Sequence, residues 1–355
     1  MTSDDAKKPY IIAETAYNHE GDFAYLNRMV DDIANLGVDA IKFHLLLSLD
    51  SYMTRTHPLY EKVKQWMFTS KQWDEIFKKC QRKSLGVIAL CDDVESIQYI
   101  LKKNIQGLEL HATSINDYYM LSEATRFTKR IILGVGGSSL SEISYAVDFL
   151  RSHGRQDLLL MYGFQSYPTN YHDINLAKMN TIHSLFHCDV GYADHTAYND
   201  PNNDVLSVGA AFMGYPVLEK HYTPDPGKER IDYHAAVGAD QMKRIIHLMT
   251  IALQTHGTGH IAMSDPEKAY GNVGPMKKAI VARLPIKKGE RLTTNNLWFK
   301  RTPQESTIPQ KQFLQLLDST ANVPIAADEI IDFSKVSYKF KTLNAAAFTK
   351  TSEKK

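Results

Sequence analysis

The stretch Pro216-Val217-Leu218-Glu219-Lys220-His221 is a short apolar run that ends in charged and metal-competent side chains. An earlier stretch, Gly191-Tyr192-Ala193-Asp194-His195, ends in the same way. Polar groups at the end of a buried strand cost free energy unless they have partners or a function there. The two stretches therefore predict neighbouring strand ends at the mouth of a barrel, with His195 and His221 as candidate metal ligands.

Eight short apolar runs of this kind recur, and each is followed by a segment with helical periodicity. They are Tyr10–Thr15, Asp39–Leu45, Gly86–Cys91, Gly107–His111, Arg130–Val135, Asp157–Tyr162, Asp189–Ala193 and Pro216–His221. Most are continuously apolar, as expected for parallel strands that are buried on both faces. The α/β alternation predicts a (β/α)8 TIM barrel. A doubly wound open sheet is the alternative, and it leaves the count of eight unexplained.

The segments between the runs have the signals of amphipathic helices. Leu26, Met29 and Ile33 recur at helical spacing and predict one apolar face. The stretch Ser139-Leu140-Ser141-Glu142 has the pattern of a capping box. It predicts the start of a helix directly after the fifth strand.

The barrel is expected to span residues 1–260. Periodicity fails over residues 261–276, where prolines and glycines predict a linker. Residues 277–341 have short apolar runs separated by turn signals, which predicts a small β-rich domain. The tail, residues 342–355, is expected to be disordered.

The composition excludes several classes of protein. The chain has 41 Lys and Arg against 40 Asp and Glu, so no overall charge favours nucleic acid. Three cysteines without CxxC spacing argue against disulfides and structural zinc, and fit a reducing compartment. The first residues lack the apolar core of a signal peptide, and no apolar segment is long enough to span a membrane. We expect a cytoplasmic protein.

Catalytic groups of such barrels lie at the carboxyl ends of the strands. Two histidines on adjacent strand ends suit a catalytic divalent metal; the alternative is that they are ordinary hydrogen-bonded loop histidines. Lys42 lies in a nearly apolar strand, where it could grip an anion, form a Schiff base or pair with Glu14 or Glu219. The glycines and serines from Gly136 to Ser139 suit an anion-binding nest, although a helix cap uses the same residues.

Several stretches together resemble the sialic acid synthase family. They are Ile11–Gly21 (IIAETAYNHEG), Gly37–His44 (GVDAIKFH), Tyr167-Pro168-Thr169, Gly191–Thr196 (GYADHT) and Leu218–Thr223 (LEKHYT). The segment Lys278–Arg301 resembles the antifreeze-like (SAF, β-clip) domain that this family carries. Members are nonulosonate synthases, which condense phosphoenolpyruvate with an N-acylated hexose such as N-acetylmannosamine. In that chemistry a metal polarises the open-chain aldehyde, the enol carbon attacks it, and water adds before phosphate leaves.

The resemblance implies a role for each matching residue. His195 and His221 match the ligands of Mn²⁺ or Mg²⁺, and Glu14 matches the catalytic carboxylate. Lys42 matches a lysine that binds phosphoenolpyruvate. The sugar-contacting positions are matched by Gln165, Tyr167, Asp194, Glu219 and Asp232. Arg301 matches an arginine that enters the active site of a second subunit, which implies a domain-swapped homodimer.

Five positions on the phosphate side depart from the family pattern. They are Leu90, Glu109, Ala112, Gly134 and Ala193. Glu109 replaces a lysine, and this change of charge opposes a trianionic ligand. Either the phosphate has moved, for instance onto Gly136 and Ser138, or the protein does chemistry on a nonulosonate-like sugar without phosphoenolpyruvate. In an aldol or epimerase reaction of that kind, Glu109 or His111 would be an added acid or base. A non-catalytic sugar-binding relative is the third possibility.

Overall fold

The computed structural model describes residues 7–166, 168–271, 277–304 and 307–337. The chain divides into two compact units, Met1–Gly259 and His260–Lys355. The expected tail, residues 342–355, lies outside the described residues. Each unit is described by itself below.

The first unit is a closed barrel of eight parallel strands in sequence order, β1 to β8. The strands are β1 (Tyr10–Glu14), β2 (Ala40–Leu45), β3 (Gly86–Cys91), β4 (Gly107–Leu110), β5 (Arg130–Gly134), β6 (Leu158–Tyr162), β7 (Asp189–Asp194) and β8 (Val217–His221). Each agrees with a predicted run to within about one residue at either end, and β1 pairs with β8 to close the ring. The predicted TIM barrel is confirmed.

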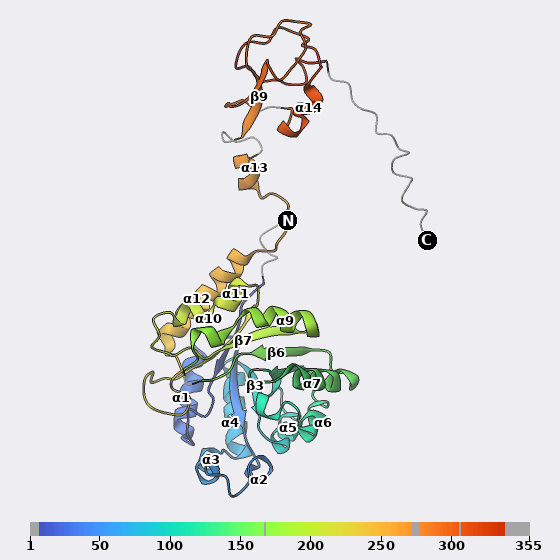
Figure 1. Ribbon diagram of the computed structural model, residues 1–355. Coiled ribbons are helices and arrows are strands. Elements are labelled where there is room, and N and C mark those ends of the chain that lie inside the picture. Colours follow the sequence, from blue (N-terminus) through green and yellow to red (C-terminus); the bar gives the residue numbers. More distant parts are fainter. Residues whose placement is uncertain (1–6, 167, 272–276, 305–306, 338–355) are drawn as a thin grey trace, which may run out of the picture. The chain divides into compact units, whose positions relative to one another are not determined.

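Helices surround the strands (Figure 1). They are α1 (Phe23–Ile33), α2 (Leu49–Tyr52), α3 (Tyr60–Trp66), α4 (Ser70–Arg82), α5 (Val94–Ile100), α6 (Tyr118–Ala124), α7 (Leu140–Ser152), α8 (Tyr171–Ile174), α9 (Ala177–Phe186), α10 (Asn203–Ser207), α11 (Gly209–Phe212) and α12 (Ala239–His256), with a 3₁₀ turn at Ala112–Ser114. The predicted capping box opens α7, with Ser139 and Glu142 capping each other. Leu26, Met29 and Ile33 are buried on the inner face of α1. The three cysteines are buried and free.

Side chains of the strands point alternately into the barrel and out toward the helices. An apolar layer crosses the barrel interior; it consists of Ile12, Ala40, Ile88, Ile132, Leu159, Met161, Ala193 and Val217. Two residues further along β1 and β8, the same interior side carries Glu14 and Glu219. The polar side chains of the mouth therefore lie directly next to this apolar layer, toward the carboxyl ends of the strands.

The outward positions of β7 and β8 hold a buried ion pair. Lys220 Nζ lies 2.5 Å from Asp194 Oδ2, and both side chains are fully buried. Asp194 also accepts hydrogen bonds from Ser207, Thr196 and Tyr192. This network joins the last two strands to α10.

The second unit contains a small antiparallel sheet of β9 (Lys278–Ala282) and β10 (Leu297–Arg301). Short β-bridges, such as Ile286 with Ile325, extend it. The remaining elements are a 3₁₀ turn (Gln310–Gln312), α14 (Phe313–Leu316) and α13 (Asp265–Gly271). The stretch expected as a linker thus contains a helix. Ser264 and Glu267 cap one another at its start, a local capping signal that outweighs the nearby proline and glycines.

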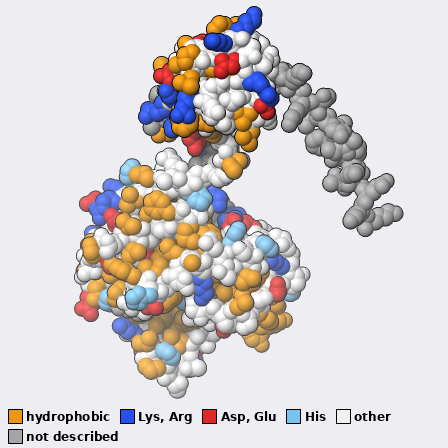
Figure 2. Space-filling model, turned by 45° about the horizontal axis from the view of Figure 1, so that its top comes forward, with side chains coloured by type: hydrophobic (Ala, Val, Ile, Leu, Met, Phe, Trp, Pro, Cys, Tyr) orange, Lys and Arg blue, Asp and Glu red, His pale blue; other side chains and the backbone are white. Residues whose placement is uncertain are grey.

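Basic and acidic side chains occur together on the visible face of each unit (Figure 2), in keeping with the formal net charge of +1. No helix in the described part of the chain has both the length and the apolar character needed to cross a membrane.

The Asp194→Asn variant tests the buried pair, because it keeps the side-chain shape and leaves Lys220 without its countercharge. We expect the free energy of unfolding to fall by about 3 to 5 kcal/mol, as when one partner of a buried pair is removed. Urea unfolding followed by circular dichroism measures it. The matched control is Asp50→Asn, which removes an exposed partner of Arg55 and should leave the unfolding midpoint unchanged. Equal midpoints for both variants would contradict the assignment.

The same ion pair should make the stability of the fold sensitive to acid. Burial opposes ionisation of Asp194, but Lys220 and the hydrogen bonds hold its pKa well below its ordinary value. A lowered carboxylate pKa stabilises the fold above the unfolded pKa of about 3.9, and this stabilisation is lost as the pH falls below it. The wild type should therefore lose more stability than Asp194→Asn when the pH is lowered below about 4.

Candidate active site

A pocket of about 350 Å³ opens at the carboxyl ends of the strands, where barrels of this kind place their chemistry. It brings together most of the residues singled out from the sequence. These are Glu14, Lys42, Glu109, His111, Gly136, Gln165, His195, Glu219, His221 and Asp232. The altered positions Leu90, Ala112, Gly134 and Ala193 line it as well. Residues far apart in sequence thus share one polar pocket.

Lys42 is the centre of this pocket. Its Nζ lies 2.7 Å from Glu219 Oε2 and 3.3 Å from Glu14 Oε2, and it donates to both carboxylate oxygens of Glu109 at 3.1 Å. All four side chains are at least 96% buried. Burial alone would lower the pKa of Lys42, but the three carboxylates raise it above its ordinary value. The contacts therefore favour Lys42 as a buried cation over Lys42 as a neutral amine nucleophile.

The three carboxylates do not share one protonation state. Burial opposes ionisation of Glu14, yet Lys42, His221 and the hydrogen bond from His44 hold its pKa well below the ordinary value. Burial, followed by the negative charge of Glu14, raises the pKa of Glu219 well above it. Burial also raises the pKa of Glu109, against the effect of Lys42. One lysine does not neutralise three buried carboxylates, so Glu14 is the ionised group and Glu219 the group that favours a proton.

His44 and Asp92 form a chain of charged groups that extends from Glu14: Glu14 contacts His44, and His44 contacts Asp92. His44 Nε2 donates to Glu14 Oε1 at 2.9 Å, and its Nδ1 lies 3.5 Å from Asp92 Oδ2. Tyr17 donates to the same Asp92 oxygen at 2.6 Å. Burial lowers the pKa of His44, but its two carboxylate partners raise it to about 10. The imidazolium is therefore charged at neutral pH and fixes the orientation of Glu14.

The sequence patterns alone indicate no role for His44, Asp92 or Tyr17. His44 lies two residues after Lys42, on the same side of β2. The two-residue period of a strand could therefore have predicted that both side chains face the barrel interior. For Asp92 and Tyr17, which lie just beyond strand ends, only the fold reveals their contact.

His195 and His221 are neighbours across the mouth, with ring centroids 5.0 Å apart. Burial and the adjacent ring lower the pKa of His195 to about 3, and burial lowers the pKa of His221. His195 Nδ1 lies 3.1 Å from the carbonyl oxygen of Ala193 and donates to it, which leaves Nε2 as an acceptor. Both rings are thus neutral, the form that binds metals. Among the described residues, however, no group of three or more His, Cys, Asp or Glu has the arrangement of a metal site.

Gln165 and Asp232 form the outer part of the mouth. Gln165 donates to Asp232 Oδ1 at 2.7 Å. Asp232 has a φ of 63°, a left-handed conformation that is uncommon for residues other than glycine and is frequent at functional sites. Their amide and carboxylate groups are the kind that hold sugar hydroxyls.

Two of the expected substrate contacts are not part of the pocket lining, a third belongs to the second unit, and a fourth is outside the described residues. Asp194 is not part of the pocket lining, because strand alternation turns it outward into its pair with Lys220. Ser138 is also outside the lining. Arg301 ends β10 of the second unit. Tyr167 is the residue outside the described ones.

The glycines after β5 have a structural reason. A Cβ at Gly136 would lie 1.7 Å from the carbonyl oxygen of Gly163, so the close approach of two backbones requires glycine there. The next residues are occupied by the capping box, in which Glu142 accepts from the backbone and hydroxyl of Ser139. The interpretation of Gly136 to Ser139 as a phosphate nest therefore has no support from the contacts.

The fold and the site define a barrel protein with a carboxylate–lysine–histidine mouth and a small second unit. Residues 29–261 match the family model described as NeuB family, and residues 277–337 match the SAF domain. The chain belongs to the NeuB family and carries a SAF domain.

Named relatives agree with this. The chain is 25% identical to the N,N'-diacetyllegionaminic acid synthase of Campylobacter jejuni, over 92% of this chain and 99% of that protein. A sialic acid synthetase from Leptospira borgpetersenii superposes with a TM-score of 0.68 at 25% identity, covering 74% of this chain and 90% of that one. A putative spore coat polysaccharide biosynthesis protein E from Chromobacterium violaceum has a similar fold, with a TM-score of 0.80 at 23% identity over 93% and 100%.

The Asp92→Asn variant tests the chain of charged groups formed by Glu14, His44 and Asp92. Loss of one carboxylate partner should lower the pKa of His44 by about 1 unit or more, since an adjacent opposite charge shifts a pKa by about 1 to 3 units. NMR titration of the His44 ring protons measures it. Tyr17→Phe, which removes only the hydroxyl that donates to Asp92, is the control and should leave His44 charged at neutral pH. A His44 ring that is neutral at pH 7 in the wild type would contradict the assignment.

Proposed function

We propose that this protein is a synthase of the NeuB type that joins a three-carbon donor to the open-chain aldehyde of an N-acylated hexose, giving a nonulosonate. One observation carries the proposal: His195, His221, Glu14 and Glu219 converge in the pocket at the barrel mouth. By resemblance, His195 and His221 match the metal ligands of the family, Glu14 matches its catalytic carboxylate and Glu219 matches a sugar-contacting position. The pair Gln165 and Asp232 lies beside them, where it would hold sugar hydroxyls.

The two carboxylates have complementary roles in this reaction. Glu14 is ionised and would act as the base, taking the proton that the donor side or the attacking water releases. Glu219 favours its protonated form and would give a proton to the aldehyde oxygen as the new carbon–carbon bond forms. Lys42 lies between them and keeps the ionised Glu14 stable in a buried site.

A divalent metal, Mn²⁺ or Mg²⁺, is part of the proposal. His195 and His221 would hold it, because two neutral imidazoles lie side by side with carboxylates nearby. Fewer protein ligands than in a structural site suit a catalytic one, in which water and substrate oxygens complete the shell. When bound, the metal would polarise the sugar carbonyl as a Lewis acid.

The first candidate donor is phosphoenolpyruvate. Membership of the NeuB family and similarity to named nonulosonate synthases support it. Atoms balance when the enol carbon bonds to the aldehyde carbon, water adds to the donor and inorganic phosphate leaves. Lys42 would have to contact this donor from within its carboxylate cluster.

The second candidate is a reaction without phosphate, in which Glu14 removes a methyl proton from pyruvate and the enolate attacks the aldehyde. The contact of Glu109 with Lys42 favours it, because both oxygens of this carboxylate lie 3.1 Å from the one lysine among the described residues that line the pocket. His44, the charged imidazole, is already paired with Glu14 and Asp92. A trianionic donor would meet an excess of buried negative charge there.

A homodimer completes the proposal. Arg301 of a second copy would enter the mouth and contribute a positive charge to it. The match of its domain to the SAF family supports this arrangement.

Metal binding can be tested apart from activity. We expect His195→Ala and His221→Ala each to weaken Mn²⁺ binding by about 10-fold or more, measured by equilibrium dialysis with metal analysis, since each removes one of two protein nitrogens. His57→Ala, which changes an exposed histidine, is the control. Unchanged binding in both pocket variants would contradict the metal site.

Product formation tests the donor. Purified protein with Mn²⁺ and a panel of N-acylated hexosamines is given phosphoenolpyruvate or pyruvate, and phosphate release and the sugar acid are measured. Glu109→Gln separates the candidates: it should raise the rate with phosphoenolpyruvate by about 10-fold, because about 1.4 kcal/mol of repulsion is relieved, and lower the rate with pyruvate. Glu61→Gln, on an exposed helix face, is the control. No product with either donor would contradict the synthase proposal.

A further inference from the structure

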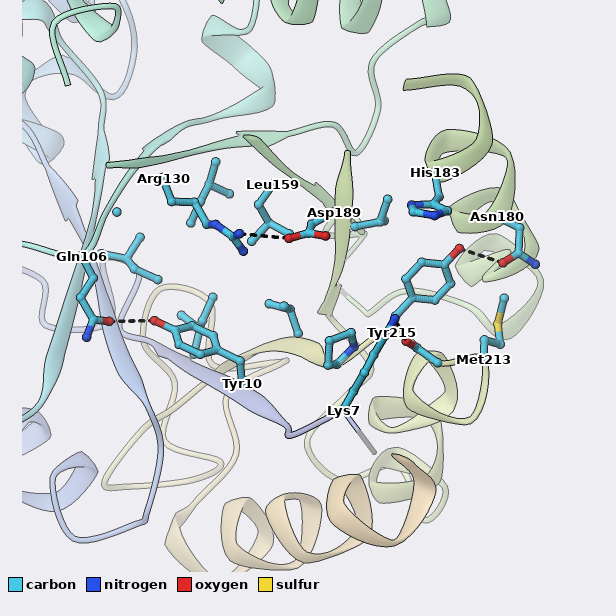
Figure 3. Close-up of a pocket in the computed structure, with 18 of the residues that line it drawn as sticks. Lys7, Tyr10, Gln106, Arg130, Leu159, Asn180, His183, Asp189, Met213 and Tyr215 are labelled. Atoms are coloured by element: carbon cyan, nitrogen blue, oxygen red, sulfur yellow. Dashed lines mark hydrogen bonds and ion pairs between the residues drawn. The ribbon is translucent and has the colours of Figure 1, made fainter. Parts of the chain in front are cut away.

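A second and larger cavity lies at the opposite end of the barrel. It measures about 690 Å³ and is lined by residues at the amino ends of the strands, among them Tyr10, Gly107, Arg130 and Asp189 (Figure 3). Its size is within the range of about 300 to 1,000 Å³ that is usual for small-molecule sites. None of the residues assigned to the mouth lines it.

The floor of this cavity is aliphatic. Its lining includes Ile12, Ile88, Ile132, Leu159 and Val217, which belong to the apolar layer that crosses the barrel.

 The five side chains of the floor, Leu159 among them, are all apolar, and the polar groups of the lining lie around the rim. An apolar ligand surface placed on them would be removed from water, which gives about 25 cal/mol per Å² of buried apolar area. The floor therefore favours an apolar or aromatic ring over a sugar.

The rim is polar and already ordered. Tyr10 donates to Gln106 Oε1 at 2.7 Å, and Tyr215 donates to Asn180 Oδ1 at 2.8 Å. Figure 3 shows these two pairs on different sides of the cavity, with Arg130 and Asp189 between them. Because each tyrosine uses the amide oxygen of its partner, the amide N–H groups remain as donors at the rim. A ligand would meet fixed donors there, with little ordering cost.

The charges of the lining favour an acidic group. Arg130 is paired with Asp189 at 3.0 Å and with Asp157 at 2.8 Å. Lys7 donates to the carbonyl oxygen of Gly214 at 3.0 Å, and no carboxylate of the described residues forms an ion pair with it. Asp157 is not part of the lining, so the described lining has Lys7 and Arg130 against the single carboxylate of Asp189. A single acidic group on the ligand would complement the remaining positive charge.

We propose that this cavity is a binding site for a small aromatic or aliphatic molecule that carries one acidic group. The site is distinct from the proposed active site and does not depend on which reaction occurs there. A nucleotide or a sugar bisphosphate fits poorly, because one unbalanced lysine faces an otherwise apolar floor.

The site also has a physical connection to the mouth. Ile12 and Val217 precede Glu14 and Glu219 by two residues on β1 and β8, and all four face the barrel interior. A ligand on the floor would therefore press on the layer that carries the two carboxylates. Close-packed interiors transmit strain.

Two fluorescent probes with the same ring system test the proposal on the full-length protein. One is 8-anilinonaphthalene-1-sulfonate, which is acidic, and the other is N-phenyl-1-naphthylamine, which is neutral. We expect both to bind saturably. Lys7→Ala should weaken the acidic probe by about threefold, as expected for a charge contact at the surface, and leave the neutral probe unchanged. Lys8→Ala, at the adjacent exposed lysine, is the matched control.

Filling the cavity should remove both probes. We expect Met213→Trp at the rim, and independently Val217→Phe on the floor, to weaken each probe by about 10-fold or more, while Met263→Trp in the second unit changes neither. Circular dichroism establishes that the variants fold. Absence of saturable binding, or wild-type binding by both filled variants, would overturn the site. Equal loss of both probes in Lys7→Ala would overturn the preference for an acidic ligand.

Discussion

The ammonium group of Lys42, held between the carboxylates of Glu14, Glu109 and Glu219, is the interaction on which the barrel mouth depends. Four buried ionisable side chains from four strands would be very costly if any one lacked its partners. The barrel meets this condition because its closure brings β1, β2, β4 and β8 to one point. The same closeness prevents the three carboxylates from ionising equally, and this inequality separates a base from an acid.

The cluster also explains why the mouth is asymmetric. On the side of His195 and His221, two neutral imidazoles face the pocket. On the other side, Glu109 occupies Lys42 and His44 is fixed between Glu14 and Asp92. An anionic substrate group on that side would meet cations that are already paired with carboxylates. Under the proposed reaction, the negative charge of the donor is therefore the property that should separate the two candidate donors most strongly.

Much of this protein was predictable from local sequence patterns. Continuous apolar runs place the eight strands, because strands buried on both faces must be apolar throughout. The Ser139–Glu142 capping box places the start of α7 correctly. Asp194 is the instructive error: its neighbour His195 belongs to the mouth, but alternation along β7 turns Asp194 outward to Lys220. The helix α13 was missed because a short exposed helix has no apolar periodicity.

The sequence by itself determined the barrel, the SAF domain and the family, because these depend on patterns that repeat along the chain or recur as short motifs. Only the tertiary structure decided which charges meet. The contacts of Lys42 with Glu109, and of His44 with Asp92, join residues that are far apart in sequence. The apolar cavity at the other end likewise exists only once the strands close. Protonation and binding depend on distance and burial, and neither is defined until the chain has folded.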